Sequence, residues 1–218
     1  MKNIIFIAPP AAGKGTQSKL ISAEYNIPHI STGDLLRDEI KSGSPLGREL
    51  QAVIDEGKLV SNDIIVKLLR ERISRVDCND GYILDGYPRN IEQAEIYKDL
   101  LSELRKDIGV VIFMDIDKEL ALSRTENRLI CSFCGASYNT SVAELSPAIE
   151  GICDKCGHTL RARTDDNKET FLNRFNTYLI ETSPLIDYYN RLGILRVIKV
   201  NENDSAQDIF NEIKKIIN

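Results

Sequence analysis

Short apolar runs alternate with longer amphipathic stretches along most of the chain. The apolar runs are rich in β-branched residues and lie at residues 3–8, 82–85, 110–115 and 195–200. Runs of this kind are typical of strands buried on both faces of a parallel sheet. Helix-like stretches lie at residues 15–25, 34–42, 46–56, 62–75, 91–106, 118–128, 168–191 and 206–217. The alternation predicts an α/β fold in which helices cover both faces of a parallel sheet.

Residues 131–161 break this alternation, because they are rich in Cys, Gly, Ser and Asn and contain no long apolar run. We interpret them as a small inserted domain. Two Cys-x-x-Cys pairs lie inside it, separated by 18 residues: Cys131 with Cys134, and Cys153 with Cys156. This spacing predicts a tetrahedral site for zinc or another thiolate-bound metal. A reduced or disulfide-bonded form without metal is the alternative.

Four thiolates leave no open coordination position, so the predicted metal is structural. A disulfide is the poorer explanation in a reducing compartment. The fifth cysteine, Cys78, is expected to pack as a small apolar residue.

Composition narrows the possible functions. The 218 residues are 42% hydrophobic and 28% charged, which argues against disorder. No apolar run approaches the roughly 18 residues of a membrane span, and the first residues do not resemble a signal peptide. We therefore expect a cytoplasmic protein without a membrane partner. The net charge of -5 argues against nucleic-acid binding.

The first apolar run leads into a loop that is similar to a phosphate-binding loop. The general pattern is G-x-x-x-x-G-K-[ST] between a strand and a helix. Here Ala8 replaces the first glycine, Gly13 and Lys14 match, and Gly15 takes the Ser/Thr position with Thr16 next. A row of backbone N–H groups at a helix N-terminus still suits phosphate oxygens. The groups expected to bind phosphate oxygens are those of Ala11, Ala12, Gly13, Lys14, Gly15 and Thr16.

The alternative for this loop is an ordinary strand-to-helix turn in which the lysine has no role in phosphate binding. Two further stretches weigh against it, because each ends a strand-like run with a turn and an arginine. They are residues 30–37, which end at Arg37, and residues 84–90, which contain Asp85 and Arg89. An arginine on a rigid turn suits bidentate phosphate binding.

Taken in order, the segments APPAAGKGTQ, STGDLLR, GKLVS, LDGYPRN and LRARTDD resemble the adenylate kinase family over essentially the whole chain. The resemblance implies a P-loop NTPase-like CORE made of residues 1–30, 61–127 and 164–218. It also implies an AMP-binding helical segment at residues 31–60 and a LID at residues 128–163. Many bacterial members carry a Cys₄ zinc in this LID, although Asn139 here occupies a place often held by histidine.

The resemblance also implies roles for individual residues. Thr32 and Gln93 would contact the adenine of AMP, while Arg37 and Arg89 would hold its phosphate. The full implied AMP set is Thr32, Arg37, Lys58, Leu59, Val60, Gly86, Arg89, Gln93, Arg163 and Arg174. The implied ATP set adds Arg124 and Arg128 to the loop. The implied catalytic set is Lys14, Asp85, Arg89, Arg124, Arg128, Arg163 and Arg174.

In this scheme Asp85 would bind Mg²⁺ through its waters, and Asp165 and Asp166 would orient arginines. The two histidines, His29 and His158, receive no catalytic role. The implied activity is the reversible, Mg²⁺-dependent reaction ATP + AMP ⇌ 2 ADP, by direct in-line transfer in a monomer.

Three alternatives stay open at this point. One is a kinase for UMP, CMP or GMP, or one with GTP as donor. Another is a zinc ribbon that binds nucleic acid or a protein. The third is an inactive relative, because Ala8 and Ala11 replace loop glycines. An alanine in left-handed backbone costs on the order of 1 kcal/mol, whereas a negative φ accepts it. We expect a working loop.

Overall fold

The computed structural model describes residues 3–55, 60–162 and 166–218, and its centre is a parallel sheet. The five strands are β1 (Ile4–Ile7), β2 (His29–Ser31), β3 (Ile83–Asp85), β4 (Val110–Ile116) and β8 (Leu195–Val200). They lie in the order β2-β3-β1-β4-β8, and each neighbouring pair is parallel. All strands therefore end at one edge of the sheet, as the sequence predicts for an α/β fold.

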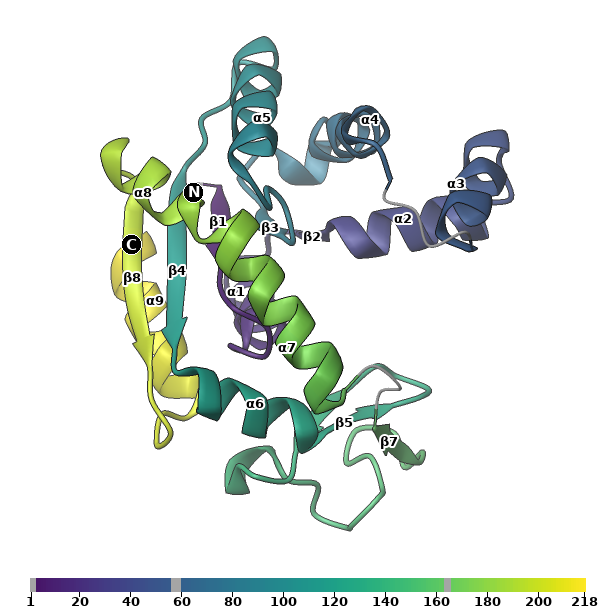
Figure 1. The fold of residues 1–218 in the computed structure, drawn as a ribbon, viewed down its shortest axis with the longest axis vertical. Coiled ribbons are helices and arrows are strands. Elements are labelled where there is room, and N and C mark those ends of the chain that lie inside the picture. The colour runs from purple at the N-terminus through teal and green to yellow at the C-terminus, as the bar shows by residue number, and fades with distance from the viewer. Residues whose placement is uncertain (1–2, 56–59, 163–165) are drawn as a thin grey trace.

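Helices cover both faces of this sheet (Figure 1). They are α1 (Lys14–Tyr25), α2 (Thr32–Lys41), α3 (Pro45–Asp55), α4 (Asn62–Ile73), α5 (Ile91–Glu103), α6 (Lys118–Glu126), α7 (Lys168–Thr177), α8 (Pro184–Arg191) and α9 (Ala206–Ile217). Figure 1 shows α2 and α3 projecting to one side of the sheet, and α6 leading away from the end of β4.

The period of two along each strand creates two separate hydrophobic cores. Ile4 and Phe6 of β1 face α1, α6, α7 and α9, whereas Ile5 and Ile7 face α4, α5 and α8. The side chains of β4 divide in the same way. Because both faces are covered, nearly every position of a central strand is apolar, which explains the continuous runs in the sequence. Cys78 is buried in the second core, as predicted.

The C-terminal helical stretch differs from the sequence prediction of one helix over residues 168–191. The structure divides it into α7, a π-helical turn at Tyr178–Thr182, and α8. Pro184 explains the break, since it has no N–H to continue the helical bonding and occupies the first position of α8. Similarly, α6 ends at Glu126, so Arg128 begins a strand rather than ending a helix.

The inserted domain is built around a second sheet that the sequence did not predict. Its strands are β5 (Arg128–Cys131), β6 (Ser137–Asn139) and β7 (Leu160–Ala162), paired antiparallel in the order β6-β5-β7. Within the described residues, no helix is long and apolar enough to cross a membrane.

Candidate active site and metal centre

Three strand ends supply the residues that the sequence analysis selected for phosphate binding. The loop after β1 leads into α1, Ser31 ends β2 and is the N-cap of α2, and Asp85 ends β3. β3 lies between β1 and β2, so these ends are neighbours at the carboxyl edge of the sheet. That is the edge at which open α/β sheets bind ligands.

The loop between β1 and α1 keeps the geometry of an anion-binding helix start. Gly13 caps α1 with φ +95°, and its carbonyl accepts the N–H groups of Thr16 and Gln17, both at 3.0 Å. The N–H groups of Lys14 and Gly15 precede these first helical bonds, so they suit phosphate oxygens. The Lys14 ammonium donates to the carbonyl of Ala8 at 3.3 Å.

Ala11 is the residue in this loop that departs from a relaxed backbone. Its φ is +60°, in the left-handed region, whereas Ala8 has no positive φ. A negative φ accepts alanine without cost, so the replacement of glycine is tolerated at Ala8 but strained at Ala11. A methyl group in this conformation costs on the order of 1 kcal/mol.

Charged groups surround the end of β3. Asp85 is 18% exposed and contacts the Nε2 atom of His29 at 3.3 Å. Burial alone would raise the pKa of Asp85, but the His29 contact and the positive charges of Lys14 and Arg89 hold it below its usual range. For Lys14, burial lowers the pKa and Asp85 opposes this shift. Asp85 is therefore an ionised carboxylate at neutral pH.

Three residues of the expected acceptor site converge on one turn. The hydroxyl of Thr32 donates to the carbonyl of Gly86 at 3.2 Å, and Arg89 Nε donates to the same carbonyl at 2.9 Å. A side chain on Gly86, which has φ +80°, would meet the Thr32 hydroxyl at 3.2 Å. Glycine is thus required here both by the backbone and by this close approach.

Other predicted acceptor residues are already engaged within the protein. Gln93 is buried, accepts from the backbone N–H of Arg89 at 2.8 Å and donates to Asn62 at 3.0 Å. Arg37 pairs with Asp34 on its own helix at 2.5 Å. Val60 lies just before α4, while Lys58, Leu59, Arg163 and Asp165 lie outside the described residues.

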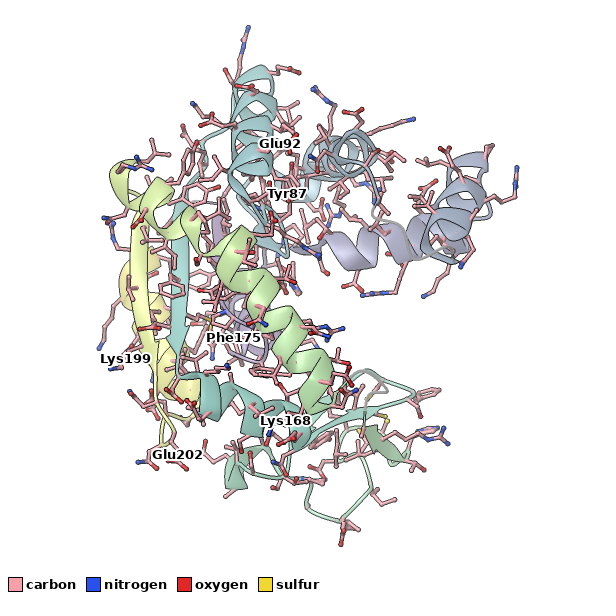
Figure 2. The ribbon with its side chains drawn as sticks, in the orientation of Figure 1. Tyr87, Glu92, Lys168, Phe175, Lys199 and Glu202 are labelled. Carbon is pink, nitrogen blue, oxygen red and sulfur yellow. The ribbon has the colours of Figure 1, made fainter. Side chains whose placement is uncertain are left out.

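The arginines expected near the donor lie around the junction of α6 and β5. Arg128 makes a two-bond pair with Asp166, whose side chain is 1% exposed, and the Nε–Oδ2 distance is 2.7 Å. Arg124 reaches the carbonyl of Asn201 at 3.4 Å, just after β8. Arg174 lies in the last turn of α7. Figure 2 shows Phe175, the next residue, on α7.

The four predicted metal ligands meet in the inserted domain. Sulfur atoms of Cys131, Cys134, Cys153 and Cys156 all lie within 4.8 Å of one another. Cys131 and Cys156 are separated by 3.4 Å, and Cys134 and Cys153 by 3.5 Å. Tetrahedral zinc with bonds of about 2.3 Å places its sulfurs about 3.8 Å apart, so the cluster has the size of such a site.

Neighbouring groups surround the thiol of Cys153. The hydroxyl of Tyr138 lies 3.4 Å from Cys153 Sγ and accepts the N–H of Asp154 at 2.8 Å. Burial opposes ionisation of Cys153, but the Tyr138 hydroxyl and nearby backbone N–H groups lower its pKa. Phe133 stacks on His158 at 4.1 Å between ring centroids, which joins the two Cys-x-x-Cys turns.

Comparison with known proteins agrees with this arrangement. The sequence model of the family described as adenylate kinase matches residues 6–194. An adenylate kinase of Geobacillus sp. (strain WCH70) is 40% identical over 215 residues, which cover 99% of this chain and 98% of the relative. An adenylate kinase of Clostridium tetani shows the same identity and coverage, and one of Methanothrix thermoacetophila is 41% identical over 215 residues.

The chain belongs to the adenylate kinase family. It is a phosphotransferase, and membership in the adenylate kinase family supports nucleoside monophosphate kinase activity. The resemblance inferred from the ordered phosphate-binding motifs is therefore confirmed. The cysteine cluster of this adenylate kinase family member lies where the sequence placed its LID.

Two residues near the expected site of this family member were not assigned by the sequence analysis. His29 received no role, yet it contacts Asp85 across 56 positions of sequence. Asn139 is buried, and its side-chain amide donates to the carbonyl of Arg124 at 2.7 Å. His29 lies in a strand-like stretch just before the STGDLLR segment. That position could have indicated that His29 lies near the other strand ends at the same edge of the sheet.

Proposed function

We propose that this protein catalyses the reversible transfer ATP + AMP ⇌ 2 ADP, directly and in line, with Mg²⁺. The observation that carries the proposal is that Lys14 at the start of α1 and Arg89 in the loop after β3 both act electrostatically on Asp85 at the end of β3. Phosphoryl transfer needs little covalent chemistry from the protein, so positioning and charge neutralisation are the main requirements. A cation, a carboxylate and a forked guanidinium at one sheet edge supply them.

On the donor side, we assign the ATP phosphates to the N–H groups of residues 11–16 and to the Lys14 ammonium. Lys14 is held by the carbonyl of Ala8, an interaction that a phosphate oxygen would replace. Arg124 and Arg128 are assigned to ATP as well. The ion pair with Asp166 supports this role for Arg128, because it fixes the guanidinium before substrate binds.

On the acceptor side, we assign AMP to the turn of Thr32, Gly86 and Arg89, together with Arg37, Val60 and Gln93. The shared contacts of Thr32 and Arg89 with the Gly86 carbonyl support this grouping. Arg174 is assigned to the transferred group from its place in α7. Lys58, Leu59 and Arg163 complete the proposed set and lie outside the described residues.

The residues present fit Mg²⁺ delivered with ATP. Asp85 is ionised, and magnesium commonly keeps several waters, which can donate hydrogen bonds to such a carboxylate. Bound with ATP, the ion would neutralise charge on the β- and γ-phosphates. His29 keeps the Asp85 carboxylate in place through its contact at 3.3 Å.

We also propose that the LID metal is zinc. The four-thiolate donor set and the sulfur separations of 3.4 and 3.5 Å support a closed tetrahedral site, which zinc prefers. In this scheme the CORE, the AMP-binding segment of residues 31–60 and the LID of residues 128–163 act as three parts. The last two close over the substrates and exclude water. We further propose that the protein is a monomer in the cytoplasm.

The test is a coupled assay for ADP with purified, metal-analysed protein, ATP, AMP and Mg²⁺. Lys14→Met should lower kcat/KM by about 100-fold or more, because the positive charge that Lys14 brings to the transferred group is lost. Lys19→Met is the matched control, since Lys19 is an exposed lysine on the same helix. No ADP from the wild type would overturn the proposal, as would equal loss in both variants.

The choice of acceptor is tested in the same assay with UMP, CMP and GMP in place of AMP, and with GTP in place of ATP. The contact of Thr32 with Gly86 favours an acceptor site at this turn but does not itself select the base. We expect AMP to give the highest kcat/KM. A higher value for another monophosphate would replace AMP as the substrate while leaving the reaction class intact.

A further inference from the structure

The π-helical turn at Tyr178–Thr182 is an irregularity between two regular helices. The N–H of Ser183 donates to the carbonyl of Tyr178 at 2.8 Å, five positions earlier instead of four. One additional residue in a helical turn rotates every later position by about 100° around the axis. The residues at the end of the turn therefore face a different direction from the one that a continuous α7 would give them.

That direction is toward the loop between β3 and α5. The hydroxyl of Thr182 donates to the backbone carbonyl of Arg89 at 2.8 Å, across 93 positions of sequence. Beside it, the side-chain amide of Asn90 donates to the carboxylate of Glu181 at 3.4 Å. Both contacts join the π turn to the two residues that end the LDGYPRN segment.

Arg89 is consequently held at both of its peptide groups by side chains. Its N–H donates to Gln93 at 2.8 Å, and its carbonyl accepts from Thr182 at 2.8 Å. The guanidinium is held separately, through Nε, by the carbonyl of Gly86 at 2.9 Å. Bidentate recognition of a phosphate requires a guanidinium of fixed position and plane, which these contacts provide.

We propose that Thr182 is a positioning residue for Arg89, and that the π turn directs its hydroxyl toward the Arg89 carbonyl. The inference rests on the proposed function, which assigns Arg89 to the phosphate of the acceptor monophosphate. The bond lies in an exposed position, so its loss changes the stability of the fold little. Its effect is expressed in acceptor binding, because a displaced Arg89 carbonyl moves the guanidinium that the same residue carries.

The test compares Thr182→Val, Thr182→Ser and a control, Thr177→Val. Valine keeps the shape of threonine without the hydroxyl, whereas serine keeps the hydroxyl. Thr177 is the matched control, because its hydroxyl donates to the Asn173 carbonyl at 3.0 Å within α7 and does not hold the loop. For each variant, KM for AMP, KM for ATP, kcat and Tm are measured with the metal-loaded protein.

We expect Thr182→Val to raise KM for AMP about three- to tenfold, the range that one neutral hydrogen bond supports. KM for ATP should change less than about twofold, since the hydrogen bond that is lost holds the acceptor loop. Thr182→Ser should restore the wild-type KM for AMP, and Thr177→Val should leave both KM values unchanged. Thr182→Ala provides a second hydroxyl-free variant if the valine protein is insoluble.

An unchanged KM for AMP in both hydroxyl-free variants would overturn the inference. So would a parallel rise of both KM values together with a fall in Tm, because that pattern indicates a structural role alone. An inactive wild type would instead contradict the proposed function. The two failures are therefore distinguishable.

Discussion

The parallel-sheet body and the inserted LID stabilise themselves by different means. The body has two hydrophobic cores, in which large side chains such as Tyr97, Leu101 and Phe171 are almost completely buried. The LID core consists of Cys131, Ala136, Tyr138, Cys153 and Leu160. Two of its five buried residues are therefore predicted metal ligands. Apolar burial suffices for the body, whereas we expect the LID to depend on a metal held by its four cysteines.

The largest expected effect comes from removing one thiolate. Cys153→Ser should abolish the metal site and unfold the LID, because a structural zinc site contributes on the order of 10 kcal/mol. The body should keep its own unfolding transition, since none of the four predicted metal ligands belongs to its two described cores. Metal content and hydrogen exchange resolved by residue measure the two parts separately.

Cys78→Ala is the matched control for that experiment, because Cys78 lies in the body and its sulfur is outside the cluster. It should retain a full complement of metal. Loss of metal in Cys78→Ala, or a LID that remains protected in Cys153→Ser, would contradict the division between the two regions.

A cavity in the body should have the next largest effect. Leu101→Ala empties a position that is 1% exposed in the second core, and we expect a loss of about 2–5 kcal/mol in the free energy of unfolding. Leu129→Ala in the LID removes a partly buried side chain beside the cysteines and should leave that free energy almost unchanged. Urea unfolding of both variants provides the comparison, and equal losses would contradict it.

Alkaline pH should weaken the body through its tyrosines. Burial raises the pKa of Tyr82 to about 12, although its bond with Tyr97 opposes this, and burial raises that of Tyr87 to about 12. The usual value is near 10, so the unfolded chain releases these protons first and stability falls between about pH 10 and pH 12. The loss is roughly 2–3 kcal/mol for each group.

Tyr82→Phe tests whether this buried tyrosine contributes to the loss of stability at alkaline pH. It should reduce the slope of the unfolding free energy against pH above pH 10, although it also leaves the Tyr97 hydroxyl without its partner at 2.6 Å. An unchanged slope in this variant would show that other groups cause the alkaline loss.

The smallest expected effect concerns the phosphate loop. Ala11→Gly should stabilise the body by about 1 kcal/mol, because glycine accepts φ +60° without strain. Ala12→Gly, at a buried neighbour without positive φ, should instead destabilise it by a similar amount. Activity should change less than a few-fold in Ala11→Gly, and a gain of several orders of magnitude would mean that the native loop is defective.

The sequence predicted the parts of the fold that depend on local pattern. The apolar runs identified four of the five strands of the body, and the ordered motifs placed Asp85 at a strand end and Lys14 and Arg89 beyond the ends of strands. The break before Pro184 could have been predicted as well, because proline rarely continues a helix. The LID strands are short and half polar, so no periodicity distinguished them.

Contacts between distant segments were not predictable in the same way. His29 meets Asp85, and Thr182 meets Arg89, only because β2, β3 and the π turn are brought together in the folded chain. The conformation of Ala11 was likewise open, since a sequence gives the cost of a positive φ but not its presence.

The pairing of β5 with β7 has a consequence for protein engineering. Leu129 lies opposite Ala162, and Cys131 lies opposite Leu160, so the chain enters and leaves the LID through adjacent strands. A segment whose two ends are neighbours can be replaced by another segment with little effect on the body to which it is attached. A cysteine-free sequence with its own apolar core could therefore be spliced between these strands, which would give a kinase that needs no metal in its LID.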